Sequence, residues 1–314
     1  MGKRAAPANL SHSRMPFLAL LVIALGAGLL VALAAWLMPL PAQGRHAASR
    51  AAGESVGRAL RKRERLPRSL RNRFDPATAT GLALTVGALF IVSAGIVLGL
   101  LAYLVRTESG LHRVDVSAGQ WGVDHATELS TDLLQLTTYL GDTIVVASLA
   151  VVLAIVESVR RPNRWLVPFL GLVVIGQNLL TNGLKEVLDR VRPAFNPVAA
   201  TLGPSFPSGH TAAAAAFYAA AALVLGRGRG PLPRALLAGG AAALAVAVAC
   251  TRVLLGVHWL TDVVGGLALG WAWFALCSIA FGGRLLRFGV AAEDALRAAP
   301  QPAQGRARES SQAS

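Results

Sequence analysis

The chain alternates long apolar stretches with short polar segments. A helix needs about 20 consecutive apolar residues to cross the hydrocarbon core of a bilayer. Seven stretches meet or nearly meet this length: residues 16–40, 77–105, 133–156, 165–184, 211–225, 235–251 and 259–281. None of them alternates apolar and polar residues as membrane β-strands do. The pattern therefore predicts an all-α, polytopic membrane helical bundle, in which a six-helix core follows one extra N-terminal transmembrane helix.

The same pattern divides the chain into three parts. Residues 1–76 hold the first transmembrane helix and a basic cytoplasmic segment, residues 77–284 form the six-helix membrane domain, and residues 285–314 form a largely disordered cytoplasmic tail. Two points stay open. The first apolar stretch is a retained helix or a signal-like segment, and residues 49–73 form an interfacial helix on anionic lipid or a solvated basic loop.

Composition supports a membrane protein. The 314 residues are 54% hydrophobic and 15% charged, whereas a soluble domain carries about 25% charged residues. The mean hydropathy of +0.54 excludes a disordered chain and argues against an ordinary soluble enzyme. Cys250 and Cys277 stand in apolar runs, so we expect buried thiols rather than a disulfide framework or a zinc cluster.

The net charge of +14 first suggests nucleic acid as a partner, but its distribution favours membrane topology. Ten of the thirty Lys and Arg residues lie between residues 45 and 73, and others cluster in the short segments 160–164, 227–234 and 284–287. The alternate segments 106–132, 189–210 and 252–258 differ, and the first of them holds five acidic residues against two arginines. The sequence therefore predicts a multi-pass plasma-membrane protein with these alternate segments on the extracytoplasmic side, no nucleic-acid partner, and a first helix that starts outside.

Polar residues at the ends of membrane spans are costly and mark functional sites. Three groups stand at the predicted outer ends of the spans. They are Lys185 with Arg192, the turn Ser208-Gly209-His210, and Arg252 with His258 and Asp262. The predicted topology brings all three groups to the same face.

Together these residues have the chemistry of a phosphoryl-transfer site. Three cations need an anion, and the planar guanidinium suits phosphate oxygens. The turn before the helix that starts near His210 offers free backbone N–H groups to that anion. His258 and Asp262 are four residues apart and share one helix face, so the carboxylate can fix the imidazole tautomer and leave the other ring nitrogen as a nucleophile. His210 is then available as a general acid.

Each group alone also has a structural explanation. Lys185 and Arg192 could be anchors that reach the membrane interface, the turn before His210 could be a plain helix cap, and the pair His258–Asp262 could be a structural hydrogen bond. A two-histidine metal site would place a single carboxylate among three cations, which is a poor cage for a divalent metal. The ordered combination on one face favours the phosphate site.

The combination resembles the three-part signature of the type 2 phosphatidic acid phosphatase superfamily, which includes lipid phosphate phosphatases and vanadium haloperoxidases. The first motif, lysine, six residues and arginine-proline, matches Lys185 to Pro193. The second motif matches Pro207-Ser208-Gly209-His210 in full. The third motif matches Thr251-Arg252, His258 and Asp262, with Thr251 in place of the usual serine. Motifs and core together extend the resemblance over residues 77–281.

The resemblance implies roles for these residues. His258 would be the nucleophile, Asp262 its partner and His210 the acid that protonates the leaving group. The phosphate would be held by Lys185, Arg192, Ser208, Gly209 and Arg252. The resemblance implies that this protein needs no metal ion, and we expect no other cofactor. Expected substrates are lipid phosphates or pyrophosphates: a polyprenyl pyrophosphate such as undecaprenyl pyrophosphate, phosphatidylglycerol phosphate, or phosphatidic acid.

The alternatives are a phosphotransferase or haloperoxidase of the same superfamily and a non-catalytic protein, either a lipid-binding scaffold or a transporter. The sequence does not choose among the lipids or define the oligomeric state.

Overall fold

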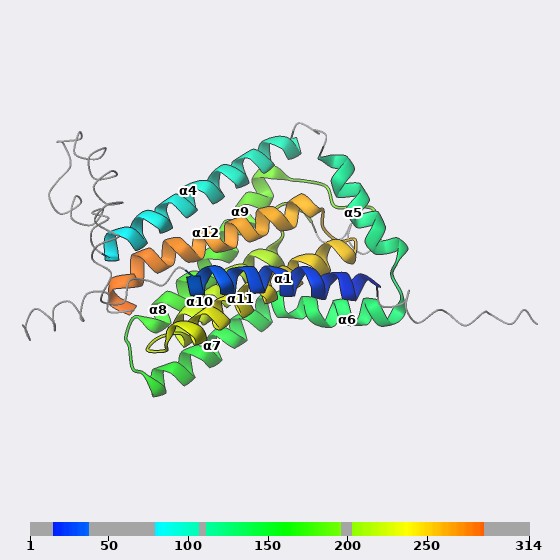
Figure 1. The fold of residues 1–314 in the computed structure, drawn as a ribbon. Helices are drawn as coiled ribbons and strands as arrows, with labels where there is room; N and C mark the ends of the chain where they lie inside the picture. Colours follow the sequence, from blue (N-terminus) through cyan, green and yellow to red (C-terminus); the bar gives the residue numbers. More distant parts are fainter. Residues whose placement is uncertain (1–14, 38–78, 107–110, 196–202, 286–314) are drawn as a thin grey trace, which may run out of the picture.

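The computed structural model describes residues 15–37, 79–106, 111–195 and 203–285 (Figure 1). Within these ranges the regular structure is helical and contains no strand, which confirms the predicted all-α membrane bundle. The basic segment 49–73 and almost all of the predicted tail lie outside the described residues. The division into residues 1–76, 77–284 and 285–314 therefore stays a prediction.

A helix or helical segment covers each of the seven predicted spans. They are α1 (Met15–Leu37), α4 (Ala79–Arg106), α7 (Thr143–Arg160), α8 (Leu166–Gly171) joined through the π-helical turn η3 (Leu172–Gly176) to α9 (Gln177–Leu188), α10 (Gly209–Leu225), α11 (Pro231–Leu254) and α12 (Leu260–Leu285). Among the described residues, five segments are long and apolar enough to cross a membrane, and the apolar stretches in α4 and α10 are shorter. The chain is a multi-pass membrane protein.

The third predicted span, residues 133–156, is wrong at its start. The helix α6 (Glu128–Thr138) ends there and is followed by the 3₁₀ turn η2 (Tyr139–Gly141) before α7 begins. The cause is Asp142, whose Oδ1 accepts hydrogen bonds from the backbone nitrogens of Ile144 (2.8 Å) and Val145 (3.4 Å). A carboxylate that caps a helix in this way defines a new N-terminus, so residues 133–141 belong to a separate element.

The predicted outer connection, residues 106–132, is largely helical. It contains α5 (His112–Asp124) and the start of α6. The helix α5 turns Asp115, Gly119 and Gly122 into the protein and packs against α11 and α12. A polar segment between two spans thus covers one end of the bundle.

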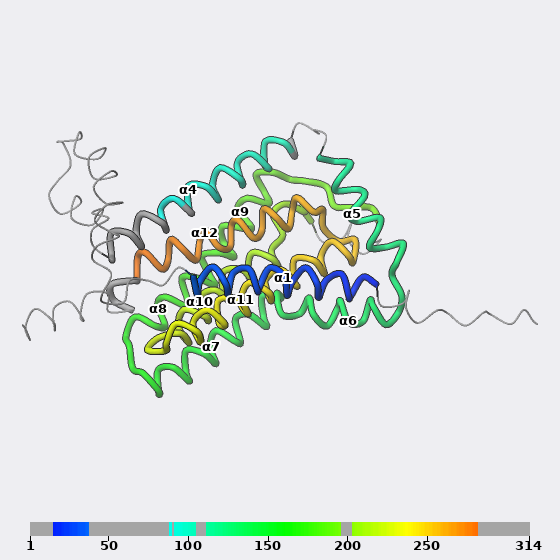
Figure 2. The backbone as a smooth tube through the Cα atoms, viewed as in Figure 1, coloured from blue at the N-terminus to red at the C-terminus, as the bar shows by residue number. Residues whose placement is uncertain are grey.

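The helix α10 lies at the centre of the bundle and contacts α7, α9, α11 and α12. Its alanines 212 to 216 are all buried. Small side chains let neighbouring backbones approach closely, which is how helices associate where lipid provides no hydrophobic driving force. Figure 2 shows α4 running along the outer side of α12, with which it is in contact.

The N-terminal helix α1 packs along α11. Gly28 and Gly239 stand at the crossing: a Cβ atom on Gly28 would lie 2.7 Å from the carbonyl oxygen of Gly239. Nearer its start, Leu20 and Ala24 are buried in a cluster with Leu134 and Ala247. The helix α1 is therefore part of the packed bundle and runs antiparallel to α11.

The bundle has two chemically different ends. At one end α7 and α10 finish, and Arg227 donates to Glu157 at 3.0 Å in a buried ion pair. Arg161 also donates to the Arg227 carbonyl there. At the opposite end, called here the site end, α7, α10 and α12 begin beside α5. The start of α1 lies at the site end too, because Met15 and Trp121 of α5 line one cavity.

Candidate active site

His258 lies in the connection between α11 and α12, and Asp262 lies in the first turn of α12. Both side chains are buried, at 2% and 0% exposed. His258 Nδ1 lies 3.3 Å from Asp262 Oδ2, and the same oxygen accepts from the backbone nitrogen of Trp259 at 2.9 Å. The pair predicted from the four-residue spacing is therefore formed, at the first turn of α12.

The opposite ring nitrogen of His258 faces Arg192, whose Nη1 lies 3.0 Å from His258 Nε2. A guanidinium can only donate, so Nε2 accepts, and Nδ1 carries the proton that it donates to Asp262. Burial lowers the pKa of His258 to about 4, although the Asp262 carboxylate acts in the opposite direction. The imidazole is therefore neutral at physiological pH, with its lone pair on Nε2.

Arg192 is held by backbone carbonyls. Its Nε donates to Gly203 O at 2.8 Å, its Nη1 to Val257 O at 2.8 Å and its Nη2 to Pro204 O at 3.2 Å. These acceptors come from both sides of the site, before α10 and after α11. The guanidinium is thus fixed beside His258 in one orientation.

Ser208 and Gly209 bring the start of α10 to the same place. The Ser208 backbone nitrogen donates to Asp262 O at 3.0 Å, and Thr211 donates to Ser208 Oγ at 2.9 Å. Gly266 of α12 allows this approach, because a Cβ there would lie 2.7 Å from Ser208 O. The N-terminus of α10 is therefore packed directly against the start of α12.

Arg252 and Lys185 complete the cationic side of the site. Arg252 Nη1 donates to Thr138 Oγ1 at 3.0 Å, whereas its Nε is buried without a hydrogen-bond partner in the described structure. A buried donor without a partner is costly, and a bound anion would satisfy it. Lys185 lies near enough for the charges of Arg192 and Arg252 to act on it.

His210, in the first turn of α10, is half-buried and has its own carboxylate. Its Nε2 lies 3.9 Å from Asp142 Oδ2, whereas the hydrogen bond that caps α7 is accepted by the other carboxylate oxygen, Oδ1. The charges of Arg252, His258 and Lys185 also act on His210. The two histidines therefore face one cluster of cations, each with an acidic partner.

The structure brings all eight predicted site residues to one end of the bundle: Lys185, Arg192, Ser208, Gly209, His210, Arg252, His258 and Asp262. Four neighbouring residues are not among the site residues predicted from the sequence: Asp115, Thr138, Asp142 and Arg190. Asp142 had a detectable signal, because an Asp-Thr pair before an apolar run is typical of a helix start. Arg190 stands in the variable stretch of the first motif, and nothing in the sequence links it to Asp115.

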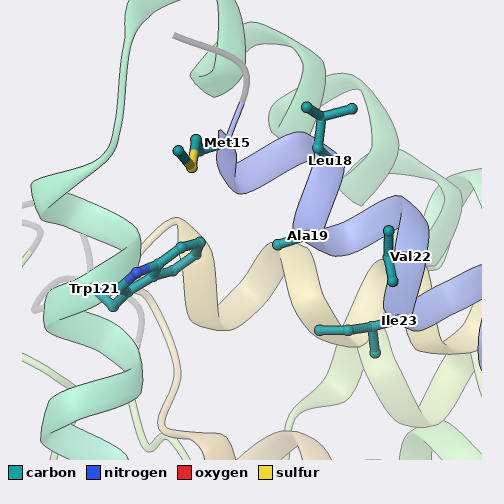
Figure 3. A pocket seen from close by; sticks show the side chains of 6 residues that line it. All are labelled: Met15, Leu18, Ala19, Val22, Ile23 and Trp121. Atoms are coloured by element: carbon teal, nitrogen blue, oxygen red, sulfur yellow. The ribbon is translucent and has the colours of Figure 1, made fainter. Parts of the chain in front are cut away.

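A cavity of about 460 Å³ lies elsewhere, between α1 and α5 (Figure 3). Its walls are the apolar side chains of Met15, Leu18, Ala19, Val22, Ile23 and Trp121. None of the eight site residues lines it, so it is not the anion site. Within the described residues, no three His, Cys, Asp or Glu side chains gather in a geometry that could hold a metal ion.

Comparisons with known proteins agree with this arrangement. The family model of the PAP2 superfamily, the type 2 phosphatidic acid phosphatases, matches residues 165–285. Phosphatidylglycerophosphatase B of Bacillus subtilis is 42% identical over 113 residues, which are 34% of this chain and 54% of that protein. Lipid A 1-phosphatase of Rhizobium johnstonii is 36% identical over 122 residues, 36% of this chain and 46% of that protein. The matched segment thus spans about half the length of these relatives.

A solved structure resembles most of the bundle. The transmembrane PAP2-type phosphatidylglycerolphosphate phosphatase from Bacillus subtilis is 30% identical and superposes with a TM-score of 0.57. The match covers 63% of this chain and 98% of that protein. Because a relative of this identity is covered over nearly its whole length, the chain belongs to the PAP2 superfamily.

Proposed function

We propose that this protein is an integral membrane phosphatase that hydrolyses a lipid phosphate or pyrophosphate through a phosphohistidine on His258. The observation that carries the proposal is the pairing of a neutral, buried imidazole with fixed cations. His258 Nε2 is oriented by Asp262 behind it and lies 3.0 Å from Arg192 Nη1, and Arg252 Nε is left without a partner. This is the donor arrangement that a phosphate beside a nucleophile requires.

In the first step, His258 Nε2 attacks phosphorus and the bond from phosphorus to the leaving oxygen breaks. His210 donates its proton to that oxygen, which leaves as an alcohol or as a lipid monophosphate. The Asp262 carboxylate stabilises the positive charge that develops on the His258 ring. Lys185, Arg192, Arg252 and the backbone at Ser208 and Gly209 hold the three remaining phosphate oxygens.

In the second step, water attacks the phosphohistidine. His210, now neutral, takes a proton from the water, the bond from phosphorus to Nε2 breaks, and inorganic phosphate leaves. The ring of His258 recovers its lone pair and both histidines return to their starting states. The residues named here provide every proton transfer, so the mechanism uses no metal ion or other cofactor.

The substrate is a lipid because the site lies at the ends of membrane spans, where a head group sits while its chains stay in the bilayer. The first substrate to test is phosphatidylglycerol phosphate, to which the names of the Bacillus subtilis relative and of the solved structure point. Another relative is named decaprenylphosphoryl-5-phosphoribose phosphatase, from Mycobacterium tuberculosis, at 35% identity over 130 residues. A polyprenyl phosphate or pyrophosphate and phosphatidic acid complete the panel.

The protein lies in the plasma membrane with the site end on the extracytoplasmic side. The charge pattern supports this orientation, because the arginines at 160, 161, 164, 227, 229 and 234 flank the helix ends opposite the site. Cytoplasmic segments carry an excess of Lys and Arg. The head group of the substrate would then lie in the outer leaflet.

The test is release of inorganic phosphate by the purified full chain from this lipid panel, with and without EDTA. We expect turnover of at least one lipid that EDTA leaves unchanged. His258→Ala should lower turnover by at least about 10³-fold because it removes the nucleophile. His125→Ala is the matched control: this histidine lies at the end of α5 and bonds only to Trp121 O, and we expect full activity.

Full activity in His258→Ala would exclude the phosphohistidine mechanism, and loss of activity in EDTA would exclude metal-free catalysis. A product analysis in which the phosphoryl group appears on an acceptor other than water would assign a phosphotransferase instead.

A further inference from the structure

Arg190 lies between two buried carboxylates. Its Nη2 donates to Asp115 Oδ2 at 2.8 Å and its Nη1 donates to Asp262 Oδ1. The side chains of Asp115 and Asp262 are 1% and 0% exposed, and that of Arg190 is 13% exposed. Removing one partner from such a buried pair is strongly destabilising, because the other charge is left uncompensated. Arg190 therefore connects α5 to the partner of the proposed nucleophile.

The contacts of Asp262 are divided between its two oxygens. Oδ2 faces His258 Nδ1 and the Trp259 backbone nitrogen, at 3.3 and 2.9 Å, whereas Oδ1 is taken by Arg190. A carboxylate bonded at both oxygens cannot rotate about its χ2 torsion. The guanidinium thus determines which oxygen faces the imidazole.

Asp115 holds the guanidinium in turn. Its Oδ1 accepts from the Thr261 backbone nitrogen at 2.9 Å, and its Oδ2 accepts from Thr261 Oγ1 at 2.7 Å. Arg190 Nη1 donates to the same hydroxyl at 2.7 Å. Because Thr261 immediately precedes Asp262, α5 and α12 clamp Arg190 from both sides. The ring of Trp259, 5.5 Å from the guanidinium carbon, covers it as a cation–π partner.

The charge of Arg190 also matters to the proposed nucleophile. A carboxylate that shares its charge with a guanidinium attracts the imidazole proton less than an unpaired one does. The other charged groups that act on His258 are Asp262, Arg192 and Arg252, and His210 lies within electrostatic reach. These groups are unchanged when Arg190 alone is replaced, so the effect of Arg190 can be isolated.

We propose that Arg190 is a positioning residue for the pair His258–Asp262: through Asp262 Oδ1 it fixes the carboxylate and limits how tightly the imidazole holds a proton, while Asp115 anchors it. The proposal rests on the function proposed above and extends the set of functional residues beyond the three motifs. It makes Asp115 of α5 a supporting member of the site.

The test compares Arg190→Gln, Arg190→Lys and the double variant Asp115→Asn/Arg190→Gln with the parent protein, each as the full chain in detergent. The kinetics of phosphate release are measured from pH 4 to 9. In Arg190→Gln we expect kcat to fall about tenfold or more with KM nearly unchanged, as on loss of a group that orients a functional residue. We expect the acid limb of kcat/KM to move up by about one pH unit, because the unshared carboxylate favours the imidazolium.

The other variants separate charge from packing. Arg190→Lys keeps the positive charge but cannot bond both carboxylates through a planar guanidinium. The acid limb of its kcat/KM profile should therefore stay in place while kcat falls. The double variant removes the unpaired Asp115 carboxylate that Arg190→Gln leaves behind. It should recover thermal stability without recovering kcat or the acid limb. Arg113→Gln is the control, because Arg113 is an exposed arginine on α5, the helix of Asp115. This variant should behave as the parent.

A second readout does not depend on activity. The imidazole of His258, assigned by its loss in His258→Gln, is titrated by NMR of histidine-labelled protein. Its midpoint should rise in Arg190→Gln and in the double variant. Equal midpoints in parent and variants, or full recovery of kcat in the double variant, would overturn the proposal. Failure of the parent to release phosphate from any lipid would instead overturn the proposed function.

Discussion

At the residue scale, each histidine of the site has a separate carboxylate, and the two pairs are built differently. His258 and Asp262 are buried and in hydrogen-bond contact, whereas His210 and Asp142 are about one-third exposed with 3.9 Å between Nε2 and Oδ2. A buried pair suits a nucleophile that must stay neutral, and an open pair suits an acid that must exchange protons with water. Asp142 places a negative charge beside His210 among the cations of the site.

This difference leads to a prediction for Asp142→Asn. Asparagine caps a helix as well as aspartate does, so α7 should still form, but the charge beside His210 is lost. We expect phosphate release from an alkyl lipid phosphate to fall about tenfold, since a poor leaving group needs the acid. Release from p-nitrophenyl phosphate, whose leaving group needs little protonation, should change less than about twofold.

The ratio of these two rates is the measurement, and Asp124→Asn is the control. Asp124 lies on the exposed face of α5 and accepts only from Gln120. Equal losses on both substrates in Asp142→Asn would show that Asp142 acts through folding rather than through His210.

The eight motif residues were predictable because their spacing repeats a known signature and because the spans alternate in direction. Their partners were not. Arg190 and Asp115 are separated by 75 residues, and Arg252 and Thr138 by 114. Such pairs follow from how helices pack, and a hydrophobic pattern gives the existence of a helix but not its rotation or its neighbours.

At the element scale, the sequence gives the spans to within a few residues and misses the interruption at Asp142. Residues 133–141 are apolar enough to resemble the start of a span. The Asp142 carboxylate, however, caps α7 by accepting hydrogen bonds from its first backbone N–H groups, so a new helix begins there. The turn that results carries Thr138 to Arg252 and Asp142 to His210. A local capping preference thus overrides the hydrophobic pattern at a place where two site contacts depend on it.

The crossing of α1 and α11 gives a prediction at this scale. In Gly239→Leu the new Cβ would meet Ala32 Cβ at 2.7 Å, so the helices must separate. We expect the free energy of unfolding to fall by about 1–3 kcal/mol, the usual cost of overpacking. Thermal unfolding in detergent measures it. Gly240→Leu is the matched control, because nothing lies within 4 Å of its Cβ. Equal melting temperatures for the two variants would show that α1 does not depend on this contact.

At the scale of the whole molecule, the arginine-rich turns and the proposed active site lie at opposite ends of the bundle. One end holds the arginine-rich turns and the buried pair Glu157–Arg227, and the other holds the proposed active site. Within the described residues, the arginines of segments 160–164 and 227–234 therefore lie away from the proposed phosphate site. The cations of the proposed site, Lys185, Arg192 and Arg252, lie at the other end.

This polarity predicts which positions a membrane-impermeant thiol reagent reaches in intact cells. In a background without Cys250 and Cys277, Asp124→Cys at the site end should be labelled from outside, and Arg229→Cys at the opposite end only after the membrane is permeabilised. The orientation follows from the excess of basic residues around Arg229. If only Arg229→Cys were labelled in intact cells, the protein would have the orientation opposite to the one proposed.

The contact between Arg192 and His258 has a further consequence. A ring nitrogen that accepts a hydrogen bond at 3.0 Å has its lone pair engaged. In the proposed mechanism Arg192 Nη1 must therefore donate to a phosphate oxygen instead of Nε2 before Nε2 attacks. Phosphate oxygens are the partners that draw a guanidinium away most effectively. If the proposed mechanism holds, the anionic substrate itself frees Nε2 by accepting this hydrogen bond. A neutral electrophile offers Arg192 no anionic oxygen, so we expect His258 to react with it more slowly than with a phosphate.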